Sequence, residues 1–166
     1  MLKQVFLIPA MLLVLSATPA VAQQTVFLVR HAERADMEKG ATKSDDPDLS
    51  NAGRARAESL ATLLKDANLT AIFITKFRRT AQTAAPLAKV TGLSPTILEG
   101  ANLAEIAKEI RAQKGNVLIV GHSNTVPDII KGLGITTPVK IGDQDFDNLF
   151  IVTSGAKPEL LQLHYR

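Results

Sequence analysis

The chain has 166 residues, of which 46% are apolar and 21% are charged, and its formal net charge at pH 7 is +3. This length is typical of one domain, and the apolar fraction excludes a disordered chain. Because the sequence contains no cysteine, a disulfide scaffold, a cysteine-based zinc finger and a thiol nucleophile are excluded. The small basic excess does not come in Lys/Arg runs, so the charge gives no reason to expect nucleic acid as a partner.

Residues 1–22 have the layout of a secretory signal peptide. Lys3 supplies a positive start, residues 5–15 form a mostly apolar run, and small residues at 20–22 suit a cleavage site. The apolar run is well short of the ~20 residues that span a bilayer, which argues against a membrane anchor. We therefore predict a cleaved signal peptide over 1–22, a single domain over 23–166 without a membrane span, and a periplasmic or secreted location.

The mature chain opens with a strand and a helix. Residues 25–29 form a continuous β-rich run, typical of a strand buried on both faces. The polar stretch 34–47 is predicted to be a surface loop. Ser50 can then cap a helix over 52–64, whose apolar residues recur at helical spacing with Arg56 as the exception on that face.

A similar alternation continues through the middle of the chain. Residues 71–74 predict a second buried strand, and a helical pattern follows over 79–90. Pro86 lies inside that pattern, so we expect the helix to start late or to kink there. Asn102 with Glu105 resembles a capping box at the start of a further helix.

The last part of the chain predicts three strands and one short helix. Residues 117–120 are the clearest strand, and Asn124 or Thr125 can cap a helix with Pro127 in its first turn. The two remaining strands are predicted over 149–152 and 160–165. Strands that alternate with helices predict an α/β fold, a three-layer sandwich with a mostly parallel central sheet and helices on both faces.

Chemically capable side chains follow three of these strands at the point where each strand ends. Ligands of such sheets bind beyond the carboxyl ends of the strands. Arg30 and His31 follow the first strand, Arg78 and Arg79 follow the second, and His122 follows the strand at 117–120. Because parallel strands end at one edge of a sheet, we expect these side chains to form one site.

Phosphoryl transfer is the chemistry that this set supports. Arginine forks match phosphate oxygens and neutralise charge in the transition state. A neutral imidazole can attack phosphorus, and nearby arginines lower its pKa. Backbone N–H groups at the helix start after His122, where Ser123 lies, add an anion site. Two histidines without clustered carboxylates or cysteines make a poor zinc site, and the phosphate-binding Gly-Lys loop is missing, so no metal or cofactor is expected.

Four segments resemble the signatures of the histidine phosphatase superfamily, in the branch of the phosphoglycerate mutase-like and phosphohistidine phosphatases. They are Arg30-His31-Ala32-Glu33, Leu49-Ser50-x-x-Gly53-x-x-x-Ala57, Arg79-Thr80-Ala81-Gln82-Thr83-Ala84 and Val120-Gly121-His122-Ser123. The resemblance covers 24–166, with the segments in the family's order. It implies His31 as the nucleophile, with Arg30, Arg79 and His122 forming the phosphate pocket, and it selects Arg79 over Arg78.

The chain departs from the family pattern in two places. Ala32 stands where glycine is commoner, and Ser123 follows the second histidine where acid-phosphatase relatives carry Asp. Many members use a Glu after the middle helix to protonate the leaving group. Glu99 is the candidate for this role here, with a solvated loop carboxylate as the alternative, and Glu33 and Asp128 are fallback donors. Phosphohistidine phosphatases of the family lack such an acid.

Other charged residues have plainer interpretations. Arg34 and Arg78 either meet an anionic substrate at the rim or are solvated surface arginines. Three aspartates are spaced like part of a calcium loop but lack its Gly and distal Glu, and we interpret them as a solvated turn: Asp143, Asp145 and Asp147. His164 is expected to be structural. The segments 35–48 and 136–148 are expected to shape the mouth of the pocket.

Together these observations predict an exported, metal-independent phosphatase that hydrolyses phosphomonoesters or phosphoramidates through a phosphohistidine on His31. The chain is too short for the large inserted cap of bigger family members. We therefore expect an accessible phosphate on a small molecule, a lipid or a peptide. The alternative is a non-catalytic phosphate or polyanion binder that uses the same pocket. A glycolytic mutase conflicts with export and with the short length.

Overall fold

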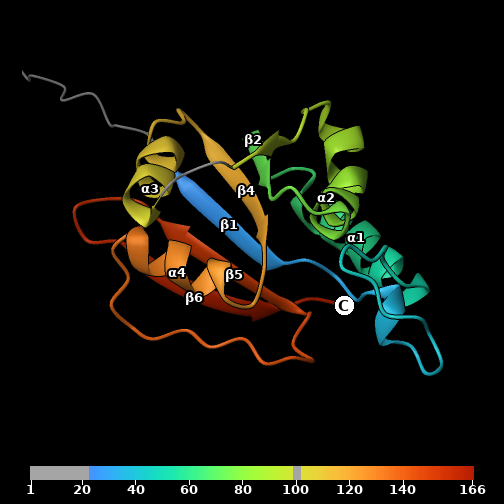
Figure 1. The fold of residues 1–166 in the computed structure, drawn as a ribbon. Coiled ribbons are helices and arrows are strands. Elements are labelled where there is room, and N and C mark those ends of the chain that lie inside the picture. Colours follow the sequence, from blue (N-terminus) through green and yellow to red (C-terminus); the bar gives the residue numbers. More distant parts are fainter. Residues whose placement is uncertain (1–22, 99–101) are drawn as a thin grey trace, which may run out of the picture.

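The computed structural model describes residues 23–98 and 102–166 (Figure 1). The predicted signal peptide over 1–22 and the candidate donor Glu99 lie outside the described residues. The strands are β1 (Thr25–Arg30), β2 (Leu69–Ile74), β3 (Thr96–Ile97), β4 (Asn116–Gly121), β5 (Asn148–Thr153) and β6 (Glu159–His164). The helices are η1 (Ala35–Met37, a 3-10 turn), α1 (Asn51–Leu64), α2 (Arg78–Thr91), α3 (Leu103–Arg111) and α4 (Thr125–Gly132).

All six strands belong to one mixed sheet in the order β3-β2-β4-β1-β5-β6. The first four strands of this order are parallel to one another, whereas β5 pairs antiparallel with β1 and β6 pairs antiparallel with β5. Arg30 of β1 is in register with Gly121 of β4, and Ile74 of β2 is in register with Val120. The carboxyl ends of β1, β2 and β4 therefore lie side by side at one edge of the sheet.

Helices cover both faces of the sheet (Figure 1). On one face, α3 and α4 contribute Ile110, Val126 and Ile130 to an apolar cluster that includes Val26 and Leu28 of β1. On the other face, α1 and α2 pack against the opposite side chains of the same strands. This arrangement confirms the predicted three-layer α/β sandwich with a mostly parallel centre. Among the described residues, no helix is both long and apolar enough to cross a membrane.

The start of α1 lies against the segment that follows β1. Ser50 caps the helix as predicted, because its Oγ accepts a hydrogen bond from the Gly53 N–H at 3.1 Å. Gly53 lies against the backbone of Glu33 so closely that a Cβ there would collide with it. Arg56, the exception on the apolar face, forms an ion pair with Glu33 at 2.7 Å and donates to the Tyr165 carbonyl. These contacts hold the residues after His31 in place.

Two predicted details of the fold were wrong, and two short elements were missed. Of the two expectations for Pro86, the late start was wrong, because α2 begins at Arg78 and runs through Pro86; the kink stays a prediction. Burial of Thr83 and Leu87 offsets the missing N–H of the proline. Asn124 precedes α4 as expected, but its side chain makes no capping bond. The strand β3 has two residues and η1 has three, which is too few for a sequence pattern.

Candidate active site

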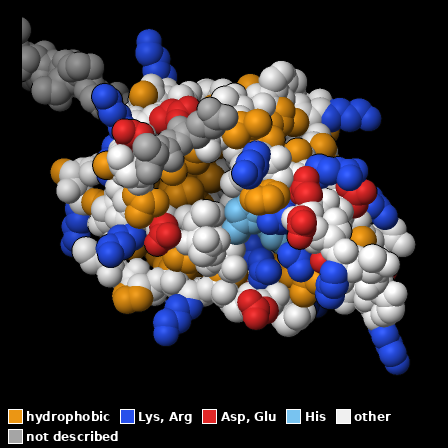
Figure 2. All heavy atoms as spheres, in the orientation of Figure 1, with side chains coloured by type: hydrophobic (Ala, Val, Ile, Leu, Met, Phe, Trp, Pro, Cys, Tyr) orange, Lys and Arg blue, Asp and Glu red, His pale blue; other side chains and the backbone are white. Residues whose placement is uncertain are grey.

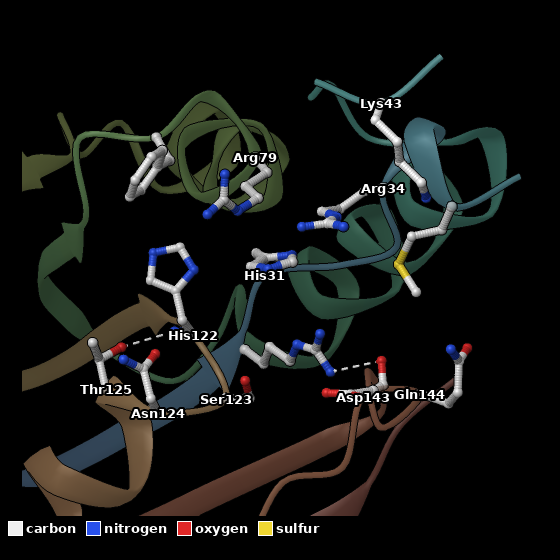
Figure 3. A pocket seen from close by; sticks show the side chains of 13 residues that line it. His31, Arg34, Lys43, Arg79, His122, Ser123, Asn124, Thr125, Asp143 and Gln144 are labelled. Carbon is white, nitrogen blue, oxygen red and sulfur yellow. Dashed lines mark hydrogen bonds between the residues drawn. The ribbon is translucent and has the colours of Figure 1, made fainter. Parts of the chain in front are cut away.

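The carboxyl ends of β1, β2 and β4 open into a cavity of about 820 Å³. Figure 2 shows histidine atoms visible on this face among blue Lys and Arg side chains. The described residues that line the cavity are Arg30, His31, Arg34, Met37, Lys43, Phe77, Arg79, His122, Ser123, Asn124, Thr125, Asp143 and Gln144 (Figure 3). Four of them are cationic and one, Asp143, is a carboxylate.

His31 lies at the centre of this set, directly after β1 (Figure 3). Its Nδ1 is 2.8 Å from the Ala32 carbonyl oxygen. Because a carbonyl can only accept, Nδ1 carries the proton and Nε2 keeps its lone pair. The side chain is 3% exposed. Burial lowers the pKa of His31 to about 3 despite the hydrogen bond to Ala32, and the nearby His122 and Arg30 lower it further. The imidazole is therefore neutral at pH 7.

Arg30 is held over the floor of the cavity by the segment before β5. Its guanidinium lies 4.1 Å from the centre of the Phe146 ring. Its Nη1 donates to the carbonyls of Gly142 at 2.7 Å and Asp143 at 3.1 Å. The buried Nε has no hydrogen-bonding partner. Burial is the main reason that the pKa of Arg30 is lowered, so an anion at this point would be stabilising.

Arg79 comes from the first turn of α2 and has a similar environment. Its guanidinium lies 4.1 Å from the centre of the Phe77 ring. Its buried Nε and Nη1 have no hydrogen-bonding partner, although Asp46 Oδ1 lies 3.6 Å from Nη1. Burial, and then the like charge of Arg34, lower the pKa of Arg79. Two arginines with unused donors thus flank His31, which is the arrangement that a phosphate needs.

His122 follows β4 and faces His31, with 5.3 Å between the two ring centres. Its Nε2 is 2.9 Å from Thr75 Oγ1, which is in turn 3.1 Å from Thr80 Oγ1. Burial lowers the pKa of His122 to about 4, with further lowering by Arg79 and Arg30. The two threonines fix one ring nitrogen, so Nδ1 is left to face a ligand.

The Arg-x-x-Gln-Thr element links α2 to the segments that follow β1. Thr83 Oγ1 donates to the Arg79 carbonyl at 2.7 Å and accepts from the Ala32 N–H at 3.0 Å. Gln82 accepts from the Leu49 N–H at 2.8 Å. The residue types of this motif therefore hold Arg79 beside His31.

The structure brings together most of the predicted site residues: Arg30, His31, Arg79, His122 and Ser123 line one cavity. The fallback donors Glu33 and Asp128 are not among its lining residues. Glu33 is held by Arg56, whose Nε donates to both carboxylate oxygens. Asp128 is exposed on α4.

The remaining charged residues divide between the cavity and the surface. Arg34 lines the cavity, whereas Arg78 is exposed and forms an ion pair with Asp48 at 2.7 Å. His164 is exposed on β6, with its Nδ1 3.2 Å from Asp147 Oδ1. Asp143 is exposed, as a solvated turn requires, yet it also lines the cavity.

Sequence reasoning missed the second layer of the site. Thr75, Phe77 and Phe146 were not singled out, although they contact the predicted residues. The position of Thr75 at the end of β2 was a usable signal, because the strand-end rule applies to it as well. Phe146 is the one large apolar side chain in a run of polar ones, which also could have marked a residue that turns inward.

Two neutral histidines and two arginines with free donors at the strand ends of an α/β sheet define a phosphate-handling site. The chain belongs to the histidine phosphatase superfamily (branch 1), whose family model matches residues 26–109. It is therefore a phosphatase of this superfamily. No curated protein matches the chain.

Solved phosphatase structures share the fold. The protein histidine phosphatase SixA in complex with tungstate is 18% identical, with a TM-score of 0.66 over 84% of this chain and 96% of that one. A mycobacterial glucosyl-3-phosphoglycerate phosphatase in complex with VO3 is 16% identical, with a TM-score of 0.62 over 85% and 98%. A candidate alpha-ribazole-5'-P phosphatase from Escherichia coli is 16% identical, with a TM-score of 0.65 over 85% and 96%.

Proposed function

We propose that this chain is an exported phosphatase that works without a metal ion and forms a phosphohistidine on His31. Its substrates are phosphomonoesters or phosphoramidates of a small molecule, a lipid or a peptide. The observation that carries the proposal is the state of His31. Its Nδ1 proton is bound to the Ala32 carbonyl, burial keeps the ring neutral, and Nε2 is left as a nucleophile between two arginines.

The reaction has two displacements at phosphorus. Arg30, Arg79 and His122 bind the phosphate oxygens, and Ser123 lies at the wall of the same pocket. The lone pair of His31 Nε2 forms a bond to phosphorus while the bond to the leaving oxygen or nitrogen breaks, and the leaving atom takes up a proton. Water then attacks phosphorus, the P–Nε2 bond breaks, and inorganic phosphate leaves with a neutral His31 restored.

Glu99 remains our proposed proton donor for ester substrates. Glu33 is bound by Arg56 and does not line the cavity. The charge of Asp143 stabilises the Arg30 cation and so opposes the lowering of the Arg30 pKa, which favours Asp143 as a counter-ion. A phosphoramidate needs less help from an acid, because its nitrogen leaving group departs readily.

The test is hydrolysis of 4-nitrophenyl phosphate by wild type and by His31→Ala, with His164→Ala as the matched control. We expect His31→Ala to lose at least about 10³-fold in kcat and His164→Ala to keep wild-type activity. Circular dichroism checks that both variants fold. An acid-labile, alkali-stable labelled phosphoryl group on quenched wild type identifies the intermediate.

Two results would count against the proposal. Full activity of His31→Ala would refute the nucleophile. Phosphate binding by wild type without turnover of any phosphomonoester or phosphoramidate would favour the non-catalytic binder.

The support for export is the signal-like composition of residues 1–22. Expression of the full chain in a bacterium, followed by fractionation and mass spectrometry, tests it. We expect a periplasmic or secreted product that begins at Gln23. A cytoplasmic product that retains residues 1–22 contradicts export without affecting the proposed chemistry.

A further inference from the structure

Two cations on the segment between β1 and α1 line the active-site cavity and have no part in the chemistry described above. They are Arg34 and Lys43. Figure 3 shows Arg34 beside Arg79 above His31, Lys43 farther out, and Asp143 on the opposite side of His31. The two cations therefore lie on the side of the cavity away from its one described carboxylate.

Asp36 contacts both cations, Arg34 through an ion pair and Lys43 through a hydrogen bond. It is the one buried residue of η1 and is 5% exposed. Its Oδ1 is 3.0 Å from Arg34 Nε, and its backbone carbonyl accepts from Lys43 Nζ at 2.7 Å. The segment is fixed in turn to the start of α1, because the Ala35 N–H donates to the Asp48 carbonyl at 2.9 Å. Arg34 and Lys43 are thus placed by the fold rather than left free in solvent.

Both side chains keep donors for a ligand. Arg34 Nε lies beside Asp36 Oδ1 as an ion pair but without a hydrogen bond. Within residues 23–98 and 102–166, the two terminal nitrogens of Arg34 make no hydrogen bond either. Lys43 uses one N–H on the Asp36 carbonyl, which leaves two. Since Arg34 is 30% exposed, a ligand that enters from solvent can reach it.

The cavity also holds more positive charge than one phosphate requires. Arg30 and Arg79 suffice for the two charges of a phosphate dianion. The charge of Arg34 acts on both of them, because after burial it contributes to the lowering of their pKa values. Asp36 lies beside Arg34 and offsets part of this charge, and a second negative group bound to the terminal nitrogens of Arg34 would relieve the repulsion that remains.

We propose that Arg34 and Lys43 form a second anion subsite, which binds a carboxylate or further phosphate on the leaving group of the substrate. The inference rests on the proposed function, because it assigns the leaving group to this side of the cavity. Met37 lies on the same segment and lines the cavity with them, so it offers an apolar contact to the leaving group. The substrate class is then a phosphate ester or amidate with a second acidic group.

The test compares substrates that differ only in that second group. Phenyl phosphate is compared with 3-carboxyphenyl and 4-carboxyphenyl phosphate on wild type, Arg34→Gln and Lys43→Gln. We expect wild type to prefer one of the carboxylates by about tenfold in kcat/KM, the size of one charge-assisted hydrogen bond at a partly exposed site. Arg34→Gln should reduce the preference to about twofold or less. The preference is the ratio of two kcat/KM values measured on the same variant, so a general loss of activity in that variant cancels out of it.

Lys39→Gln is the matched control, since Lys39 is exposed on the same segment and does not line the cavity. It should keep both the activity and the preference of wild type. A wild-type preference for neither carboxylate, or one that survives in Arg34→Gln, would overturn the proposal.

Binding separates this proposal from the proposed function. Phenylphosphonate and its 3- and 4-carboxyl derivatives cannot be hydrolysed, and calorimetry gives their affinities whether or not the protein turns over esters. Tighter binding of a carboxyl derivative, lost in Arg34→Gln, supports the subsite even if no ester is hydrolysed. Equal affinities in an active enzyme refute the subsite and leave the phosphatase proposal intact.

Discussion

Replacing His31 by glutamine should remove much of the protein's sensitivity to mild acid. His31 and His122 have ordinary pKa values of 6.5, which folding lowers to about 3 and about 4. At a pH below 6.5 but above the lowered pKa values, these two histidines bind protons in the unfolded chain and do not bind them in the folded chain. The free energy of unfolding therefore falls as the pH drops below about 6.5, and the loss is complete below the two folded pKa values.

The size of the effect follows from the two shifts. One pKa unit corresponds to about 1.4 kcal/mol. Between pH 7.5 and pH 5.0, the lowered pKa of His31 costs about 2 kcal/mol of stability. His122 is less buried, and we discount its contribution to about 1–2 kcal/mol. Wild type should therefore lose about 3–4 kcal/mol over this range, a large part of the stability of a small domain.

Urea unfolding followed by circular dichroism measures this loss for wild type, His31→Gln, His122→Gln and the control His164→Gln. The buffers must lack phosphate, because a ligand of the folded state shifts the equilibrium. The quantity compared is the difference between the two pH values, since each substitution also changes stability at pH 7.5. We expect His31→Gln to reduce the difference by about half and His164→Gln to leave it unchanged. If His31→Gln lost as much stability at pH 5.0 as wild type, the burial argument would be refuted.

Three further predictions concern neighbouring residues. Thr75→Val should weaken inhibition by inorganic phosphate about tenfold or more, because His122 loses its fixed hydrogen bond, whereas Thr75→Ser should bind like wild type; equal inhibition constants for all three would contradict this role. Gly53→Ala should lower the free energy of unfolding by about 1–3 kcal/mol, since its methyl group collides with the backbone after His31; urea titration measures it, and an unchanged midpoint contradicts it. Glu99→Gln should slow alkyl phosphates at least about 10²-fold and 4-nitrophenyl phosphate far less, while Asp143→Asn should show no such selectivity; the reverse pattern would make Asp143 the donor.

The fold could be predicted because its signals are local. Continuous apolar runs identified the central strands, and Ser50 marked the start of a helix through its own side chain. The expectation that Pro86 would delay α2 was wrong because the rule is local while the compensation is tertiary. Thr83 and Leu87 are both fully buried on that helix, and their packing cannot be seen in a window around the proline.

The site could be predicted only as far as the strand-end rule extends. That rule groups His31, Arg79 and His122 without any knowledge of side-chain contacts. It does not find Phe146, because its contact with Arg30 depends on the segment after α4 returning over the end of β1. The hydrogen bond from Arg30 to Gly142 in that segment joins residues 112 positions apart. Contacts of this kind have no local signal.

Several polar groups of the active site are buried in ways that lower the stability of the protein without a ligand. His31 is buried where protonation is unfavourable, and Arg30 and Arg79 keep buried nitrogens without partners. Each is unfavourable in the folded chain alone, because buried polar groups without hydrogen bonds cost free energy. Each becomes favourable when a phosphate occupies the cavity, since the arginines then find their acceptor and the lone pair of His31 faces phosphorus. The same burial therefore accounts for both the expected acid lability and the proposed nucleophilicity, and a substitution that removes one should remove the other.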